Sequence, residues 1–344
     1  MGAMAFFYLD QEAVLAANVL DMRRAMKVVT EAQARFANGE VREPQKIVLR
    51  NADTAESEQQ GRFNALAASI GAPVPSAIGM KWVASFPTNR QRGMPRASAL
   101  IILNCPRTGF PLAVMEGGLI SAMRTGAVTG LGVHYLAPKR PSKIGIVGAG
   151  VQSRTQILGV YTELPQVEEI ALFGRQVSMA EGVAEDCRRR WNAPVRVVRT
   201  IEDTLRDADV VLTVTTAQQP LIRAQHIKPG ALTIQLAGHE CEFGVILQCK
   251  KKIFADDWET VKQRGIMTPA IMYAQGLLRD EDIQANLREL ILGTKQGRES
   301  DERIHFCHMG MGVNDVALAW AVYQDARARN LGTSLSLCKE PLWV

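Results

Sequence analysis

The stretch that decides the fold is residues 143–159, which read KIGIVGAGVQSRTQILG. Residues 144–147 form a short apolar run rich in β-branched side chains, which predicts a buried parallel strand. Gly148, Gly150 and Ser153 follow in a G-x-G-x-x-S pattern, before a helix-compatible stretch. Such a turn lets the backbone approach a pyrophosphate, whose charge the helix N-terminus attracts. The stretch therefore predicts a dinucleotide site, although an ordinary strand–turn–helix can show the same glycines.

The chain after the glycine loop alternates between strand-like and helix-like stretches. Apolar runs predict strands at residues 170–173, 195–198, 210–214, 232–236 and 252–255. Helical spacing predicts helices at residues 178–192, 201–207, 262–272, 281–290 and 315–329. Such alternation is typical of a Rossmann-type, doubly wound parallel sheet, which we assign to residues 131–312.

The first 130 residues lack this alternation. Helical spacing follows Asp21 and recurs at residues 115–136. Strand-like stretches lie between glycine, proline and asparagine residues, at 6–9, 46–50, 62–68, 77–85 and 99–104. We therefore predict an α/β protein with a second, mainly antiparallel α+β domain. This domain would comprise residues 1–130 and, because the last helix and the tail should pack back on it, residues 313–344.

The composition is that of a globular enzyme. The 344 residues are 47% hydrophobic and 22% charged, and the net charge of +5 is spread along the chain, so no nucleic-acid partner is indicated. No apolar run is long enough to span a bilayer, and no signal peptide is visible. Six cysteines without a C-x-x-C predict reduced thiols in a cytoplasmic protein. His305 and His308 have no further ligands nearby in the sequence, so we predict no metal.

The residue that ends the second predicted strand selects between the two nicotinamide dinucleotides. An acidic residue there binds the ribose 2′-OH of NAD, whereas a nearby arginine suits the 2′-phosphate of NADP. This chain has Arg175 and no Asp or Glu, which favours NADP, although Arg175 could also stack on the adenine of NAD. The loops after the fourth and fifth strands lie where such folds bind ligands, and they contribute Thr215, Thr216, Ala217, Ala237 and Gly238.

Several motifs upstream of the glycine loop occur in a specific order. They are GMKWV at 79–83, FPTN at 86–89, TGFP at 108–111, MEG at 115–117 and SAMRTGA at 121–127. Together with the glycine loop they make the chain resemble the ornithine cyclodeaminase/mu-crystallin family, from about residue 6 to residue 329. The resemblance implies that the N-terminal domain binds substrate and forms a homodimer, and that the Rossmann domain binds NAD or NADP.

The resemblance also implies roles for individual residues. Lys81 and Arg124 would bind the substrate α-carboxylate, with Lys46 assisting, and Thr125 would touch the cofactor. A carboxylate needs cationic, preferably bidentate, donors that hold the α-carbon against the nicotinamide. Lys81 lies in an apolar run and Arg124 among small and apolar residues, where either would be costly to bury without an anionic partner. The cofactor candidates in and beyond the glycine loop also include Val151, Gln152 and Gly310.

One position departs from the ornithine cyclodeaminase pattern, which has a catalytic Asp after the fifth strand. Here residues 238–242 read GHECE, and Glu240 takes the place of that Asp. A Glu can act as an acid or base, but its carboxylate lies one methylene further out, and His239 could transfer the proton instead. The catalytic candidates are therefore Glu240, His239 and Lys81.

Three segments look most like one branch of the family: FPTN at 86–89, GMPRASA at 93–99 and DDWE at 256–259. This branch supplies 2,3-diaminopropionate for siderophores or antibiotics. Its members oxidise N-(2-amino-2-carboxyethyl)-L-glutamate to an imine, which hydrolyses to 2-oxoglutarate and 2,3-diaminopropionate. A substrate with three carboxylates needs extra cations, which could be Lys46, Arg50, Arg92 and Arg96. The alternatives are an NADPH-dependent imine or ketimine reductase, an ornithine cyclodeaminase, and a non-catalytic NADPH-binding protein like mu-crystallin.

Overall fold

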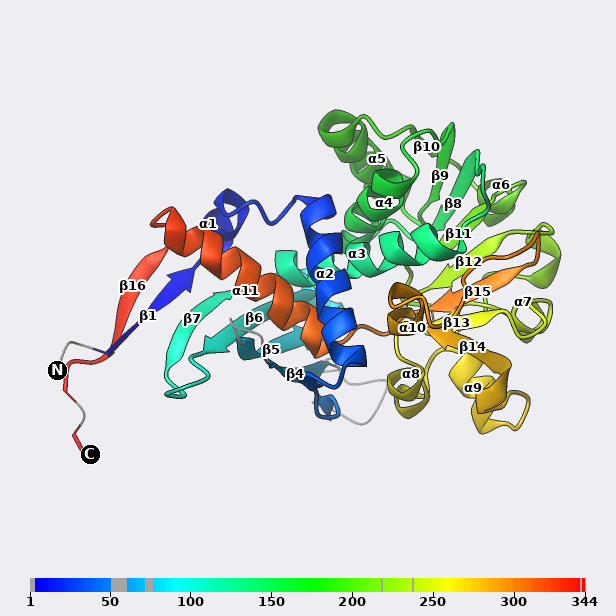
Figure 1. Ribbon diagram of the computed structural model, residues 1–344. Helices are drawn as coiled ribbons and strands as arrows, with labels where there is room; N and C mark the ends of the chain where they lie inside the picture. Colours follow the sequence, from blue (N-terminus) through cyan, green and yellow to red (C-terminus); the bar gives the residue numbers. More distant parts are fainter. Residues whose placement is uncertain are drawn as a thin grey trace. The chain divides into compact units, whose positions relative to one another are not determined.

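A computed structural model describes residues 4–50, 61–71, 77–217, 219–236, 238–340 and 342–343 of the chain (Figure 1). The chain divides into two compact units, residues 1–124 with 311–344 and residues 125–310. We call them the antiparallel unit and the Rossmann unit. The predicted domain limits lie close to these divisions, and the roles given to the domains stay predictions. Ala237, a predicted cofactor residue, lies outside the described residues.

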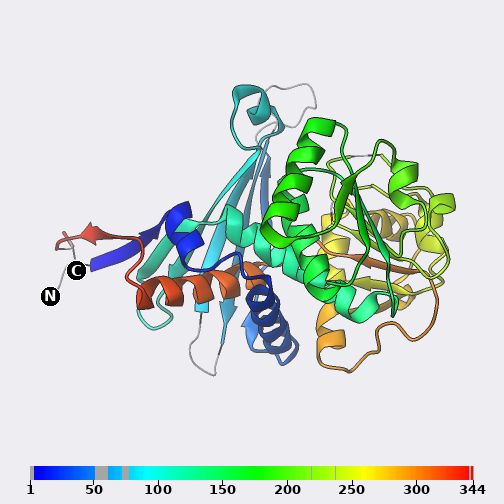
Figure 2. The same ribbon diagram turned by 90° about the horizontal axis from the view of Figure 1, so that it is seen from above.

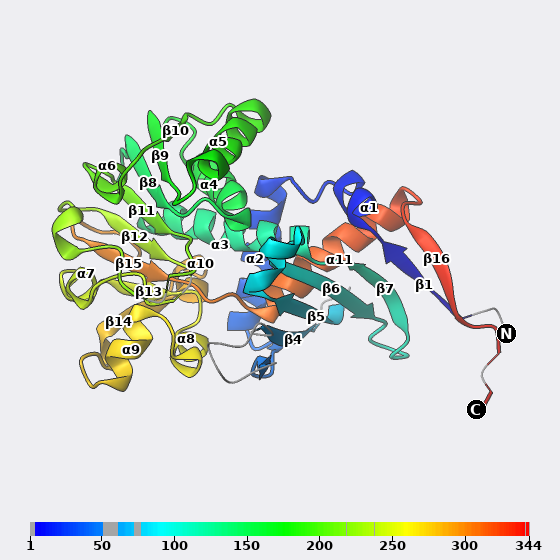
Figure 3. The same ribbon diagram turned by 180° about the vertical axis from the view of Figure 1, so that it is seen from behind.

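The antiparallel unit is built on one eight-stranded sheet in the order β16-β1-β7-β6-β5-β4-β2, with β3 paired to β4. Figure 3 labels the strands from β16 to β4. β1 and β7 pair in parallel, whereas the other described pairs are antiparallel. Helices α2 and α11 pack on each other, and α11 also packs on β4, β5 and β6 (Figures 1 and 2). The last helix and the tail therefore fold back on this unit, as predicted.

The bounds of the elements in this unit are β1 (Met4–Leu9), α1 (Gln11–Ala16), α2 (Met22–Ala37), β2 (Val41–Arg42), β3 (Ile47–Arg50), β4 (Arg62–Ile70), β5 (Ala77–Ser85), η1 (Pro87–Arg92), β6 (Ala97–Asn104), β7 (Pro111–Glu116), α11 (Gly312–Ala328) and β16 (Thr333–Cys338). Helix α3 (Gly118–Leu136) begins in this unit and continues into the next.

The Rossmann unit is built on an eight-stranded sheet in the order β10-β9-β8-β11-β12-β15-β13-β14. Its paired strands are parallel. The strand order reverses at β8, between β9 and β11, and in such sheets ligands bind at the carboxyl ends of the strands around this point. The predicted Rossmann-type sheet is therefore confirmed.

The bounds of its elements are β8 (Lys143–Val147), α4 (Val151–Glu163), β9 (Glu169–Phe173), α5 (Val177–Trp191), β10 (Val195–Val197), α6 (Ile201–Leu205), β11 (Val210–Thr213), η2 (Ala224–His226), β12 (Leu232–Gln235), α7 (Phe243–Leu247), β13 (Ile253–Ala255), α8 (Trp258–Arg264), α9 (Thr268–Ala274), η3 (Asp280–Asp282), β14 (Ile283–Asn286), α10 (Leu287–Ile291) and β15 (Ile304–Cys307).

The strand that opens the Rossmann unit is buried as its sequence predicts. Ile144 and Ile146 of β8 are fully buried in the sheet. A Cβ atom on Gly159 of α4 would overlap the backbone carbonyl of Gly126 in α3, so the two helices can pack only with glycine there. This close packing sets α4, and with it the glycine loop, at the end of β8.

Three predicted helices have different bounds in the structure. Residues 115 and 116 belong to β7, and α3 starts later because the Glu116 carboxylate accepts hydrogen bonds from the Gly118 and Leu119 amides. The helix predicted at 262–272 is two helices, because Gly265 takes a left-handed conformation with φ of 65°. The prediction of a helix at 281–290 was wrong for residues 283–286, which pair with β13 as strand β14.

Candidate functional site

The glycine loop has the geometry that its sequence predicts. Gly148 has φ of 120°, and a Cβ there would lie 2.6 Å from the Val214 carbonyl, so only glycine fits. Ser153 is fully buried and locks the turn, because its Oγ donates to the Gly148 carbonyl at 2.7 Å and accepts from the Gly150 amide at 2.9 Å. Val151, the first residue of α4, is 69% exposed. The N-terminus of α4 is therefore open to an anion.

The end of β9 lies against this loop. The Gly148 amide donates to the Phe173 carbonyl at 2.8 Å, and a Cβ on Gly174 would lie 2.6 Å from that of Ala149. Arg175 follows directly, is exposed, and forms no ion pair with a carboxylate in the described chain. The structure thus places Arg175 one residue beyond the point where the end of β9 meets the candidate pyrophosphate loop.

The loops after β11 and β12 also meet each other. A Cβ on Gly238 would lie 3.1 Å from the Ala217 carbonyl, and the Ala217 amide donates to Thr215 Oγ1 at 3.0 Å. Both loops lie at the carboxyl edge of the parallel sheet, as does Thr216, so the structure brings these predicted cofactor residues to the expected edge.

Glu240 lies inside the Rossmann unit rather than on its surface. Its side chain is fully buried, and its Oε2 accepts from Thr213 Oγ1 at 2.9 Å. Its Oε1 accepts from both the amide and the hydroxyl of Thr215, at 2.8 and 2.6 Å. The carboxylate thus connects the loop after β12 to the end of β11 and the loop that follows it. Sequence reasoning did not find Thr213, which looks like an ordinary strand residue.

His239, the neighbouring residue, has a different environment. Its ring is partly buried and lies 5.6 Å from that of Phe243, centre to centre. Its Nε2 is buried and has no hydrogen-bond partner in the described part of the chain. Burial lowers the pKa of His239 below its ordinary value, so the ring is neutral at pH 7 and can accept a proton.

The loop that contains Gly310 is held by a carboxylate that sequence reasoning did not assign to the site. Asp256, fully buried at the end of β13, accepts hydrogen bonds from the Met309 amide at 3.0 Å and the Gly310 amide at 2.8 Å. Burial raises the pKa of Asp256 to about 6, despite these bonds. Its position in the DDWE motif could have pointed to it, but that motif was used only for the resemblance to one branch of the family.

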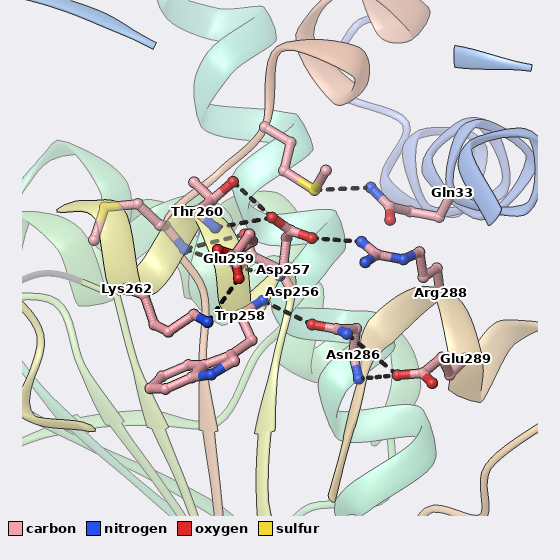
Figure 4. A network of polar contacts seen from close by, with 12 residues as sticks. Gln33, Asp256, Asp257, Trp258, Glu259, Thr260, Lys262, Asn286, Arg288 and Glu289 are labelled. Atoms are coloured by element: carbon pink, nitrogen blue, oxygen red, sulfur yellow. Dashed lines mark hydrogen bonds and ion pairs between the residues drawn. The ribbon is translucent and has the colours of Figure 1, made fainter. Parts of the chain in front are cut away.

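The next residue of that motif anchors the neighbouring helices. Asp257 pairs with Arg288 at 2.5 Å and caps α8 through the amide and hydroxyl of Thr260 (Figure 4). The amide of Trp258 donates to Asn286 at 2.7 Å. The two aspartates therefore have different structural roles. Asp256 holds the Gly310 loop, and Asp257 holds the segment from β13 to α8.

The predicted substrate cations of the antiparallel unit form a buried cluster around one carboxylate. Lys81 Nζ donates to Asp315 Oδ2 at 2.7 Å and to Ser121 Oγ at 2.9 Å. Arg124 Nε donates to Asp315 Oδ1 at 2.9 Å. Lys81 is 2% exposed, Arg124 7% and Asp315 0%. Asp315 is thus the anionic partner that the burial of these cations requires. Sequence reasoning had named residue 315 only as the first residue of a predicted helix.

The charges of this cluster balance only when Lys81 is deprotonated. Burial, and then the charge of Arg124, lower the pKa of Lys81 to about 7 against the opposing effect of Asp315. Burial alone would raise the pKa of Asp315, but Arg124 and Lys81 together hold it below its ordinary value. With Lys81 protonated, the two cations and one carboxylate leave a net charge of about +1, which a further carboxylate would balance.

The other predicted substrate residues separate into two places. Lys46 lies near Lys81, since its charge contributes to lowering the pKa of Lys81. Arg96 lies instead near Arg62 and Arg90, whose charges, after burial, lower its pKa. Thr125 directly follows Arg124 in α3 and begins the Rossmann unit.

The described residues contain no cluster of three or more His, Cys, Asp or Glu side chains that could hold a metal ion. None of the helices in the described ranges is long and apolar enough to cross a membrane.

Comparison with known proteins places the chain in a family. The sequence model of the ornithine cyclodeaminase/mu-crystallin family matches residues 9–330. The chain belongs to the ornithine cyclodeaminase/mu-crystallin family. The resemblance inferred from its motifs is therefore confirmed.

Members of the ornithine cyclodeaminase/mu-crystallin family with known activities resemble the whole chain. The alanine dehydrogenase of Archaeoglobus fulgidus is 33% identical over 96% of this chain and 98% of its own length. The N-((2S)-2-amino-2-carboxyethyl)-L-glutamate dehydrogenase of Staphylococcus aureus is 29% identical over the same shares. The Delta(1)-pyrroline-2-carboxylate reductase of Thermococcus litoralis, solved with NADH and L-proline, has a TM-score of 0.87 and 27% identity, and covers 95% of this chain and 99% of its own.

An archaeal alanine dehydrogenase dimer with bound NAD has a TM-score of 0.85 and 30% identity, over 97% of this chain and all of its own. These relatives support an NAD(P)-dependent amino-acid dehydrogenase or imine reductase. The predicted enzyme class, and NAD or NADP as its cofactor, are thereby confirmed.

Proposed function

We propose that the protein oxidises N-(2-amino-2-carboxyethyl)-L-glutamate with NAD(P)⁺. The glutamate α-carbon gives a hydride to the nicotinamide, and its nitrogen loses a proton, which forms a C=N bond. Water then adds to this imine, and the C–N bond breaks to release 2-oxoglutarate and 2,3-diaminopropionate. The single observation that carries the proposal is the buried cluster of Lys81, Arg124 and Asp315, whose excess positive charge suits an α-carboxylate.

The relative of that activity from Staphylococcus aureus, which is 29% identical, supports the choice of substrate. In the proposed reaction, Lys81 and Arg124 bind the carboxylate next to the reacting carbon and so fix the orientation of that carbon. The bound dinucleotide supplies the hydride acceptor. Of the residues of this chain, the glycine loop with the N-terminus of α4 would hold its pyrophosphate, and Arg175 would hold the adenosine end. The predicted homodimer stays a proposal.

His239, rather than Glu240, is the acid/base that the geometry supports. The accepted bonds of Glu240 leave it little freedom to meet a substrate, and they make it a positioning residue for the Thr215 loop. We expect His239→Gln to lower kcat by about a hundredfold or more and to change the pH profile. We expect Glu240→Gln to leave kcat and its pH dependence unchanged but to weaken dinucleotide binding. A hundredfold loss of kcat in Glu240→Gln, together with a wild-type kcat in His239→Gln, would reverse the assignment.

The proposed function is tested by following the absorbance of reduced nicotinamide. The enzyme is mixed with NAD⁺ or NADP⁺ and with N-(2-amino-2-carboxyethyl)-L-glutamate, ornithine, lysine, alanine or glutamate. We expect a rise with the first substrate, together with 2-oxoglutarate, and faster reduction of NADP⁺ because Arg175 suits a 2′-phosphate. No rise with that substrate would refute the proposal, and equal rates with NAD⁺ would refute the role of Arg175.

A second candidate is an NADPH-dependent imine reductase. The specific observation in its favour is Arg175, which follows the end of β9, is exposed and has no carboxylate partner in the described chain, together with the fold shared with a pyrroline-2-carboxylate reductase. Oxidation of NADPH by cyclic imines, in the absence of any amino-acid oxidation, would support it. Turnover of ornithine would favour a cyclodeaminase, and cofactor binding without turnover of any compound would favour a mu-crystallin-like binder.

A further inference from the structure

Lys81 and Arg62 lie on the same face of the antiparallel sheet. The register of β5 and β4 sets Lys81 opposite Leu66 and Ser85 opposite Arg62. Residues that are directly opposite share a face, and side chains alternate along a strand, so Lys81, Ser85 and Arg62 all point to one side. Four residues along β5 correspond to about 13 Å between the backbone positions of Lys81 and Ser85.

Arginine residues gather at the Arg62 end of this face. Arg50 of β3 stands directly opposite Arg62 of β4. Burial, and then the charge of Arg50, lower the pKa of Arg62. Burial, and then the charges of Arg62 and Arg90, lower the pKa of Arg96. We call Arg50, Arg62, Arg90 and Arg96 the arginine cluster.

The arginine cluster has no carboxylate counter-charge among the residues that the structure describes. No carboxylate in the described ranges lies within ion-pair distance of its four guanidinium groups. Like charges directly opposite each other on adjacent strands destabilise a sheet. Two buried atoms on this face also have no hydrogen-bond partner in the described chain: Arg62 Nε and Asn64 Oδ1. Asn64 lies two residues after Arg62 in β4 and therefore on the same face of the sheet. Buried polar atoms without partners cost stability unless a ligand or water satisfies them.

We propose that the arginine cluster binds the carboxylates of the substrate that do not take part in the reaction. This inference rests on the proposed function, and it defines the substrate class as amino acids with at least two further carboxylates. The Lys81 and Arg124 pair then holds the carboxylate at the reacting carbon, and the guanidinium groups of Arg62 and Arg96 hold the remote ones through bidentate, charge-assisted hydrogen bonds. Alanine and cyclic imino acids, with one carboxylate, leave the cluster empty and are poor substrates.

The test compares Arg62→Gln and Arg96→Gln with Arg107→Gln, a change at an exposed arginine of the same unit outside the cluster. For N-(2-amino-2-carboxyethyl)-L-glutamate, we expect KM to rise by about ten- to a hundredfold in the first two variants, with kcat little changed. Arg107→Gln should behave as wild type. The thermal midpoint should stay or rise in the cluster variants, because a like charge is removed, whereas a purely structural role predicts a fall.

Binding of tricarballylate, measured by calorimetry, tests the cluster without turnover. We expect it to bind the wild type and Arg107→Gln, and to bind Arg62→Gln about tenfold or more weakly. If the wild type oxidises the proposed substrate and Arg62→Gln keeps its KM, the cluster has another role while the proposed function stands. If the wild type does not oxidise that substrate, the proposed function fails. The proposed carboxylate site is refuted separately if tricarballylate binds the wild type and Arg62→Gln equally well, or binds neither.

Discussion

Arg124→Ala is expected to lower kcat/KM for the amino-acid substrate by about a thousandfold, which is about 4 kcal/mol of transition-state stabilisation. The physical reason is the charge balance of the buried cluster. Without Arg124, Lys81 and Asp315 form a neutral pair, and nothing in the cluster attracts the α-carboxylate. Lys81→Ala should have an effect of the same order, because the one remaining cation is then neutralised by Asp315.

Cofactor binding provides the internal control for both variants. Quenching of tryptophan fluorescence by reduced dinucleotide should give the wild-type dissociation constant, because the candidate cofactor residues of the Rossmann unit are unchanged. Arg107→Ala, an exposed cation of the antiparallel unit, should keep wild-type kinetics. Unchanged kcat/KM in both Lys81→Ala and Arg124→Ala would remove the substrate carboxylate from this cluster.

Asp315→Ala is expected to reduce the free energy of unfolding by about 3–5 kcal/mol. Asp315 is fully buried and is the carboxylate that contacts both Lys81 and Arg124. Its removal leaves two buried cations facing each other without a counter-charge. The loss should be visible as a lower midpoint in urea, with an unchanged slope.

The same helix offers a matched control. Asp325 of α11 pairs with Arg24 at 2.7 Å, and both side chains are partly exposed, at 37% and 25%. Since exposed ion pairs contribute little, Asp325→Ala should cost about 1 kcal/mol or less. An equal effect of the two substitutions would mean that the cluster around Asp315 is not the buried, charge-dependent structure described above.

Sequence reasoning predicted the chemistry of individual residues better than their partners. The burial of Lys81 and Arg124 among apolar residues predicted an anionic partner, but Asp315 lies 234 residues from Lys81 along the chain. Sequence spacing carries no information about a contact made by two distant elements of one unit. Arg96 shows the same limit: it was grouped with Lys46 by charge, and the sheet places it with Arg62 instead.

The sequence by itself determined the glycine loop, the parallel sheet around it and the family, because these depend on local patterns: a buried strand, glycines at fixed offsets and alternating elements. The tertiary structure alone decided that two threonines hydrogen-bond Glu240, that Asp256 holds the Gly310 loop, and that Asp315 pairs with both predicted substrate cations. In each case a carboxylate meets donors brought to it by strand order and helix packing. Its role is therefore set by which groups surround it in space.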